Sequence, residues 1–174
     1  MSSETAINQL ILDEGGFVID QGGPTNHGIT LAYLQDLNTR NPDFVASLDI
    51  YDNGQLTEQS IRDLSTSDAI LIYQKYEWLP IYDQINYPPI AAKLFNISVN
   101  SGDIPTVKCL QRAVRAASGA ILDLDGGLGN NTLSAVNLCN SVALLAAFKA
   151  EIAAHYRSLN QPQDLDGWLA RAYR

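Results

Sequence analysis

The chain has 174 residues, of which 46% are hydrophobic and 17% are charged, and its formal net charge is -8. This length suits one domain, or one main lobe with a subdomain, and the apolar content excludes an intrinsically disordered chain. The acidity argues against a nucleic-acid binder, because phosphate contacts need a cationic surface. The most apolar stretch, 142–154, contains Lys149 and Glu151 and falls short of the roughly 20 apolar residues of a membrane span.

The first half of the chain shows helical periodicity interrupted by one glycine-rich segment. Three apolar residues follow the spacing of one helix face before Gly15-Gly16 ends that helix: Ile7, Leu10 and Ile11. Residues 17–28 are rich in turn formers, which forbid a long helix and leave room for a short β-hairpin. Later helices are predicted to begin at hydroxyl side chains that suit helix N-caps: Thr30, Thr57 and Ser65.

The second half is helical throughout in this interpretation. Helices are expected over 88–100, 104–117, 142–159 and 164–174, with a further helix capped by Thr132. We therefore predict a mainly α fold with one small β-hairpin near the N-terminus.

Glu14 stands where a charged side chain is unexpected. It continues the apolar stripe of the first helix, so its carboxyl group is predicted to face the core or a cleft wall. The negative end of a helix dipole and partial burial both favour a protonated carboxyl group, the form that a general acid needs. A slight rotation of the helix would instead leave Glu14 as an ordinary surface residue.

Asp20 and Thr25 follow Glu14 across the glycine-rich segment. Two carboxyl groups on opposite arms of a cleft, one protonated and one ionised, are what the cleavage of a glycosidic bond requires. A hydroxyl group such as that of Thr25 could position the attacking water. These three residues are the candidate catalytic set.

The run 11–30 resembles the signature of the glycoside hydrolase family 108 N-acetylmuramidases, lysozyme-like proteins of phages and bacteria. The matching positions are Glu14-Gly15-Gly16, Asp20, Gly22-Gly23, Thr25 and Gly28-Ile29-Thr30. Later segments are similar to the same family, so that the resemblance covers essentially the whole chain: FNISVNSG, CLQRAV, DLDGGLGNNT and GWLARAY.

The resemblance implies a lysozyme-like helical fold with a catalytic lobe over 1–87. Residues 88–174 would complete the fold and include a peptidoglycan-binding segment. The implied activity is hydrolysis of the β-1,4 bond between N-acetylmuramic acid and N-acetylglucosamine, with Glu14 as the acid and Asp20 and Thr25 in support. The chain departs from the family pattern in a shorter loop after Asp20 and in Asn96, where an aspartate is common.

Six residues are candidates for substrate binding: His27, Thr30, Tyr76, Trp78, Asn96 and Asn100. The two aromatic side chains can stack on sugar rings, although Tyr76 could equally belong to the core. The two asparagines lie four residues apart on one helix face, where they could recognise N-acetyl groups or bridge two helices. His27 and Thr30 belong to the signature run and would line the cleft.

No metal or cofactor is expected. Cys109 and Cys139 fit no metal or redox spacing, and the histidines at 27 and 155 are far apart in the sequence. The segment Asp123-x-Asp125-Gly begins like a calcium loop. However, Ser134 stands where the last loop position needs a glutamate, which favours a structural turn.

The predicted partner is the glycan strand of peptidoglycan, with no nucleic acid and no membrane span, and we expect a monomer. Residues 1–87 carry a net charge of -10, whereas 88–174 carry +2 and could attract muropeptide carboxylates. The N-terminus lacks the basic and apolar segments of a secretory signal. We therefore expect synthesis in the cytoplasm and action on peptidoglycan in the periplasm or cell wall.

Two other functions fit the same sequence. A non-catalytic peptidoglycan-binding protein could keep the fold and lose turnover, which the short loop and Asn96 would allow. A lytic transglycosylase also uses one glutamate but releases 1,6-anhydro products.

Overall fold

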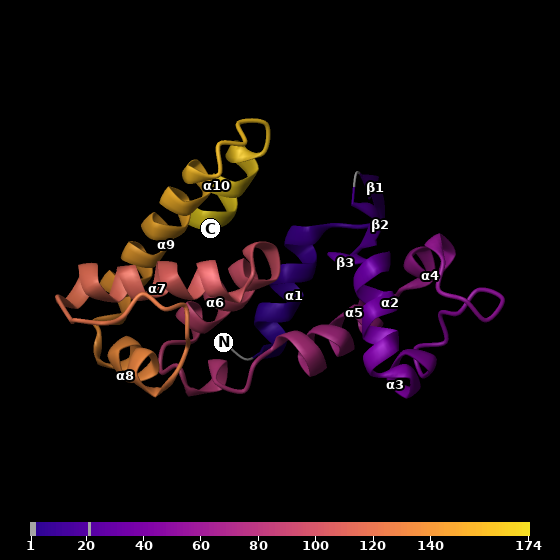
Figure 1. The fold of residues 1–174 in the computed structure, drawn as a ribbon, viewed down its shortest axis with the longest axis horizontal. Helices are drawn as coiled ribbons and strands as arrows, with labels where there is room; N and C mark the ends of the chain where they lie inside the picture. Colours follow the sequence, from indigo (N-terminus) through magenta and orange to yellow (C-terminus); the bar gives the residue numbers. More distant parts are fainter. Residues whose placement is uncertain (1–2, 21) are drawn as a thin grey trace. The chain divides into compact units, whose positions relative to one another are not determined.

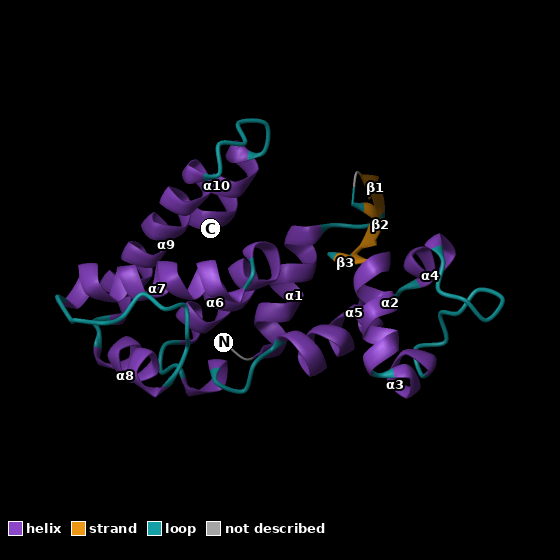
Figure 2. Cartoon of the chain, in the orientation of Figure 1, coloured by secondary structure: helices purple, strands orange, loops and turns teal. Residues whose placement is uncertain are grey.

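The computed structural model describes residues 3–20 and 22–174, without the side chain of Asp20. The chain forms two compact units, here called the N-terminal unit (Ser3–Glu77) and the C-terminal unit (Trp78–Arg174) (Figure 1). The fold is mainly α and lysozyme-like, as predicted, with a small sheet near the N-terminus (Figure 2). Among the described residues, no helix has the length and apolar character needed to cross a membrane.

The N-terminal unit contains five helices and one three-stranded sheet among its described residues. The helices are α1 (Ser3–Glu14), α2 (Leu31–Arg40), α3 (Pro42–Ala46), α4 (Glu58–Asp63) and α5 (Thr66–Ile72), which continues into the π-helical turn η1 (Tyr73–Glu77). The strands are β1 (Val18–Asp20), β2 (Gly23–Asn26) and β3 (Ile29–Thr30). They pair antiparallel in sequence order, so the structure extends the predicted hairpin by one short strand.

The turn between β2 and β3 consists of His27 and Gly28, with φ angles of 52° and 78°. Two positive φ values define the tight turn whose twist matches that of paired strands. The pairing of Asn26 with Ile29 follows from this two-residue turn. The Asn26 amide also donates to the carbonyl oxygens of Ile61 and Leu64 at 3.0 and 3.2 Å, which ties the hairpin to α4.

The predicted N-caps of this unit are confirmed. The Thr30 hydroxyl accepts the Tyr33 N–H at 3.1 Å, and Thr57 and Ser65 form capping boxes at the starts of α4 and α5. Behind these caps lies a core of fully buried side chains: Ile7, Leu10, Leu34, Leu37, Ile61 and Ile72. In this core α1 packs against α5 and η1.

The C-terminal unit is organised around α7. Its elements are a 3-10 turn η2 (Tyr82–Gln84), α6 (Pro88–Ser101), α7 (Asp103–Ser118), α8 (Asn130–Leu138), α9 (Ser141–Ser158) and α10 (Leu165–Tyr173). Helix α7 contacts α6, α8 and α9, and α9 lies beside α10 (Figure 1). Side chains with no exposed area fill the space between them: Leu94, Leu110, Leu144, Phe148 and Ile152.

Two lysines donate hydrogen bonds to carbonyl groups at the C-terminal end of α10. Lys93 donates to the Arg171 carbonyl at 2.8 Å, and Lys149 donates to the carbonyls of Tyr173 and Arg174 at 2.9 and 2.6 Å. The last carbonyls of a helix have no partner within the helix, and the helix dipole is negative there. The two ammonium groups supply the hydrogen-bond donors that these carbonyls lack. Their positive charge is also favourable at the negative end of the helix dipole.

The predicted cap of α8 is wrong. The helix begins at Asn130 after Gly129, and Thr132 is buried within it. Its hydroxyl donates to the Gly127 carbonyl at 2.8 Å and accepts from the Gln111 amide at 3.2 Å. The hydroxyl therefore holds the loop before α8 in place through these hydrogen bonds and does not cap the helix.

Candidate active site

Glu14 is the last residue of α1, and its side chain is partly buried. It directly follows the buried face of that helix, which packs against α5 and η1. This agrees with the predicted position at the end of an apolar stripe. The carboxyl group thus lies at the rim of the core of the N-terminal unit.

Gly28 brings the β2–β3 turn against this carboxylic side chain. A Cβ atom at Gly28 would lie 2.8 Å from Cγ of Glu14 and 2.6 Å from the Tyr73 hydroxyl. Real Cβ atoms do not approach other atoms so closely, and φ is +78° here. Only glycine therefore suits this position, and its backbone forms one wall around Glu14.

Tyr73 also holds this turn in place. Its ring is 3% exposed, and its hydroxyl donates to the His27 carbonyl at 2.9 Å. Tyr73 opens the π-helical turn η1, a type of distortion that is frequent at functional sites. No local sequence pattern indicates that the Tyr73 hydroxyl reaches the turn beside Glu14.

The other two candidate catalytic residues belong to the sheet. Thr25 is half-buried on β2, paired with Val18 on one side and Thr30 on the other. Asp20 ends β1 opposite Gly23, and its side chain lies outside the described part of the chain. The structure therefore brings Thr25 into the hairpin whose turn contacts Glu14, and places Asp20 by its backbone alone.

His27 and Thr30 also lie on this hairpin, and both side chains are half-buried. Nε2 of His27 lies 3.5 Å from the Thr66 hydroxyl, whereas Nδ1 is buried with no hydrogen-bond partner in the described part of the chain. The Thr30 hydroxyl accepts the N-cap hydrogen bond of α2. It keeps a proton that it could still donate to a ligand.

A second partly buried glutamate, Glu77, lies at the end of η1 and was not a sequence candidate. The Tyr33 hydroxyl donates to Glu77 Oε1 at 2.5 Å. Burial, followed by this hydrogen bond, raises the pKa of Tyr33 well above its usual value. Tyr33 therefore remains a neutral donor to Glu77, and this contact connects α2 to η1.

The aromatic candidates pack in separate clusters. In the N-terminal unit, Tyr76 meets Phe44 edge to face at 5.0 Å between ring centroids. In the C-terminal unit, Trp78 packs against Tyr82 at 5.4 Å and Phe95 at 5.3 Å. All the same, both candidates keep partly exposed surface.

The two candidate asparagines of α6 have different surroundings. Asn96 is buried, with 8% of its surface exposed. Asn100 is exposed, and its Oδ1 accepts the Tyr156 hydroxyl at 3.0 Å. Of the two, Asn100 is the residue whose side chain solvent can reach.

No group of three or more histidine, cysteine, aspartate or glutamate side chains among the described residues could hold a metal ion. Cys109 and Cys139 are both free and buried. Asp125 accepts hydrogen bonds from the Gln111 amide at 2.7 Å and the Gly127 N–H at 2.8 Å. The aspartate-glycine segment is therefore a hydrogen-bonded turn in this structure.

In this lysozyme-like helical fold, a partly buried glutamate ends the first helix against a glycine turn. The sequence profile of the family described as Glycosyl hydrolase 108 matches residues 7–102. The chain belongs to this family, and this agrees with the resemblance seen in its sequence.

The solved structures to which the chain is similar include one that covers nearly all of it. The structure of Brucella abortus SagA shares 26% sequence identity and a TM-score of 0.72, and the alignment covers 98% of this chain and 88% of SagA. The comparison with curated proteins gives no match. The division of function between 1–87 and 88–174 stays a prediction.

Proposed function

We propose that the protein is a peptidoglycan N-acetylmuramidase that hydrolyses the β-1,4 bond between N-acetylmuramic acid and N-acetylglucosamine. The observation that carries this proposal is the placement of Glu14. It is a partly buried carboxyl group at the end of α1, and Gly28 and Tyr73 fix the chain around it. Membership of the glycosyl hydrolase 108 family supports a glycan as the substrate.

In the proposed reaction, Glu14 gives its proton to the glycosidic oxygen as the bond from C1 of N-acetylmuramic acid to that oxygen breaks. Positive charge then develops on the sugar ring, as in the oxocarbenium-like transition state of glycosidases. A water molecule adds to C1, and the proton that it loses restores the acid form of Glu14, which completes the hydrolysis. Asp20 would stabilise the positive charge or orient this water, and Thr25 would assist it with its hydroxyl.

The remaining candidates would hold the glycan strand. His27 and Thr30 lie on the hairpin next to Glu14 and offer ring nitrogens and a hydroxyl. Tyr76 and Trp78 offer aromatic faces, and Asn100 offers an exposed amide for an N-acetyl group, whereas the buried Asn96 does not reach a ligand. In this proposal the protein acts on peptidoglycan in the periplasm or cell wall.

Purified peptidoglycan digested with wild type and Glu14→Gln tests the proposal. The glutamine cannot donate a proton as an acid, so release of soluble muropeptides should fall by at least about 100-fold. Glu4→Gln is the matched control, since Glu4 is exposed on the same helix. Equal release by wild type and Glu14→Gln would show that Glu14 is not the acid.

Mass spectrometry of the released products distinguishes the other two functions. Hydrolysis gives reducing N-acetylmuramic acid ends, whereas a lytic transglycosylase gives 1,6-anhydro ends. Retention of the protein on insoluble peptidoglycan without any released product would indicate a binding protein instead.

A further inference from the structure

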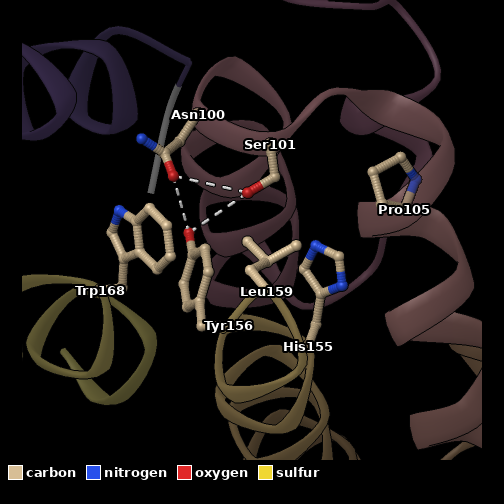
Figure 3. A pocket seen from close by; sticks show the side chains of 7 residues that line it. All are labelled: Asn100, Ser101, Pro105, His155, Tyr156, Leu159 and Trp168. Carbon is tan, nitrogen blue, oxygen red and sulfur yellow. Dashed lines mark hydrogen bonds between the residues drawn. The ribbon is translucent and has the colours of Figure 1, made fainter. Parts of the chain in front are cut away.

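A cavity of about 310 Å³ lies within the C-terminal unit, where the end of α6 meets α9 and α10. Its lining includes Asn100, Ser101, His155, Tyr156, Leu159 and Trp168 (Figure 3). No lysine, arginine, aspartate or glutamate belongs to the lining. His155 is therefore the one histidine, lysine, arginine, aspartate or glutamate in the lining, although the protein as a whole is strongly acidic.

One edge of the cavity carries a small network of polar groups. The Tyr156 hydroxyl donates to Oδ1 of Asn100 at 3.0 Å, and the Ser101 hydroxyl lies 3.5 Å from both oxygens. This network fixes the amide of Asn100, because its oxygen is already engaged. The amide nitrogen points away from Tyr156 (Figure 3) and is available as a donor to a ligand.

An aromatic surface adjoins this network (Figure 3). The ring of Trp168 stacks on that of Tyr156 with centroids 5.3 Å apart and planes 26° apart. Tyr156 is 1% exposed, so it forms the floor, whereas Trp168 is half-buried and keeps surface for a ligand. Flat aromatic surfaces of this kind pack against the apolar faces of sugar rings.

His155 completes the wall as a neutral group. Burial, and then the positive charge of Arg112, lower the pKa of His155 below its usual value. At neutral pH its ring therefore has one donor and one acceptor nitrogen instead of a positive charge. This suits an uncharged ligand that carries both hydroxyl and amide groups.

We propose that this cavity binds one N-acetylated sugar residue of a glycan strand, with the ring next to Trp168 and the acetamido oxygen on the amide of Asn100. A volume of about 310 Å³ is at the small end of ligand pockets, which span about 300–1,000 Å³. It suits a single sugar residue better than a longer piece of chain. The choice of an N-acetylated glycan rests on the proposed function.

The test is a titration of the full-length Glu14→Gln protein with tri-N-acetylchitotriose, followed by two-dimensional ¹H–¹⁵N NMR. The replaced glutamate prevents turnover during the measurement. The indole signal of Trp168 and the amide signals of Asn100 should shift and reach saturation. Cellotriose, which has no acetamido groups, should bind at least about tenfold more weakly, since a lost hydrogen bond of about 1.4 kcal/mol corresponds to tenfold.

Added to this background, Asn100→Asp removes the amide donor while keeping the shape, and should also weaken chitotriose binding about tenfold. Asn131→Asp is the matched control, because it makes the same change at an exposed position on α8. Ser101→Ala, which removes one hydroxyl from the network, should weaken binding as well. It provides the test if Asn100→Asp does not fold.

The proposal fails if saturating chitotriose shifts neither signal, or if a folded Asn100→Asp protein binds as well as its parent. This result is separable from the test of the proposed function. Hydrolysis by wild type without binding at the cavity overturns only the cavity assignment. Binding at the cavity without hydrolysis by wild type overturns only the muramidase proposal.

Discussion

At the residue scale, the site is defined by three positions that are distant in the sequence. Glu14 ends α1, Gly28 forms the tight turn of the hairpin, and Tyr73 opens the π-helical turn η1. Glycine is required at position 28 because both other side chains occupy the space that a Cβ would need. The structure therefore gives a physical reason for the glycine within the signature run.

Gly28→Ala tests whether this close packing matters for activity. The new methyl group would force apart Glu14 and Tyr73 at a position with positive φ, so we expect a loss of about 1–3 kcal/mol in the free energy of unfolding. Because the methyl group also displaces Glu14, peptidoglycan hydrolysis should fall more than the loss of folded protein explains. Thermal unfolding and a hydrolysis assay below the unfolding transition measure the two effects.

Gly16→Ala is the control for this change. A Cβ at Gly16 meets no atom within 4 Å, and its φ does not lie in the left-handed region. We expect its stability and activity to stay close to those of wild type. Full activity in Gly28→Ala would show that the position of Glu14 does not depend on this turn.

At the element scale, the loop between α7 and α8 depends on the buried amide of Gln111. Its Nε2 donates to Asp125 Oδ1 at 2.7 Å and lies 3.2 Å from both the Gly127 carbonyl and the Thr132 hydroxyl. Its Oε1 accepts the Gly126 N–H at 3.0 Å. The Gln111 side chain therefore supplies hydrogen bonds to a loop that has no regular secondary structure.

Gln111→Leu should destabilise the protein by about 2–4 kcal/mol. Leucine fills a similar volume but loses the four hydrogen bonds of the Gln111 amide, each worth about 0.5–1.5 kcal/mol. Of the partners, Thr132 is buried, whereas Asp125 and Gly127 are exposed and can bond to water instead. Denaturant unfolding measures the change. Gln59→Leu is the comparison, since Gln59 is exposed and should change stability by less than about 0.5 kcal/mol. Equal stability of the two variants would contradict the assignment of Gln111 as the organising residue.

The same loop predicts a dependence of stability on acid. The hydrogen bond from Gln111, and then that from the Gly127 N–H, lower the pKa of Asp125 below its ordinary value. A carboxyl group with a lowered folded-state pKa contributes stability above its unfolded-state value, and this is lost as the pH falls through the folded-state value. The stability of wild type relative to Asp125→Asn should therefore decrease as the pH falls below about 4, the ordinary pKa of an aspartate.

Unfolding curves of the two proteins at several pH values check this expectation. Asp123→Asn, in the same loop, controls for the removal of one exposed negative charge. A constant difference between wild type and Asp125→Asn over the whole range would show that the carboxylate of Asp125 contributes nothing through these hydrogen bonds.

The elements of this chain were predictable where one residue determines the local structure. Thr30, Thr57 and Ser65 cap helices as expected, because an N-cap depends on nearby backbone groups alone. Thr132 has the same chemistry but bonds to Gly127 and Gln111, and no local pattern reveals partners in a separate helix. The contact of Tyr73 with the hairpin turn could not be predicted either, because its partner His27 is distant in the sequence.

At the scale of the whole molecule, the net charge belongs almost entirely to the N-terminal unit, Ser3–Glu77. That unit has 12 acidic and 3 basic residues, whereas the C-terminal unit has 7 acidic and 8 basic residues. Four cations of the C-terminal unit already bind protein groups: Lys93, Arg112, Arg115 and Lys149. They are therefore less able to attract muropeptide carboxylates than the charge count of the sequence indicates.

This distribution predicts the sign of the salt dependence of peptidoglycan hydrolysis. An acidic protein and a glycan with carboxylate-bearing peptides repel each other, and salt screens that repulsion over a Debye length of about 30 Å at 0.01 M and about 10 Å at 0.1 M. The apparent KM for peptidoglycan should therefore fall as salt rises across this range, with a smaller change in kcat. An uncharged chitin oligosaccharide should show no such fall, since it carries no carboxylates to repel. A KM for peptidoglycan that rises with salt would instead mean that the cations of the C-terminal unit dominate the encounter with the wall.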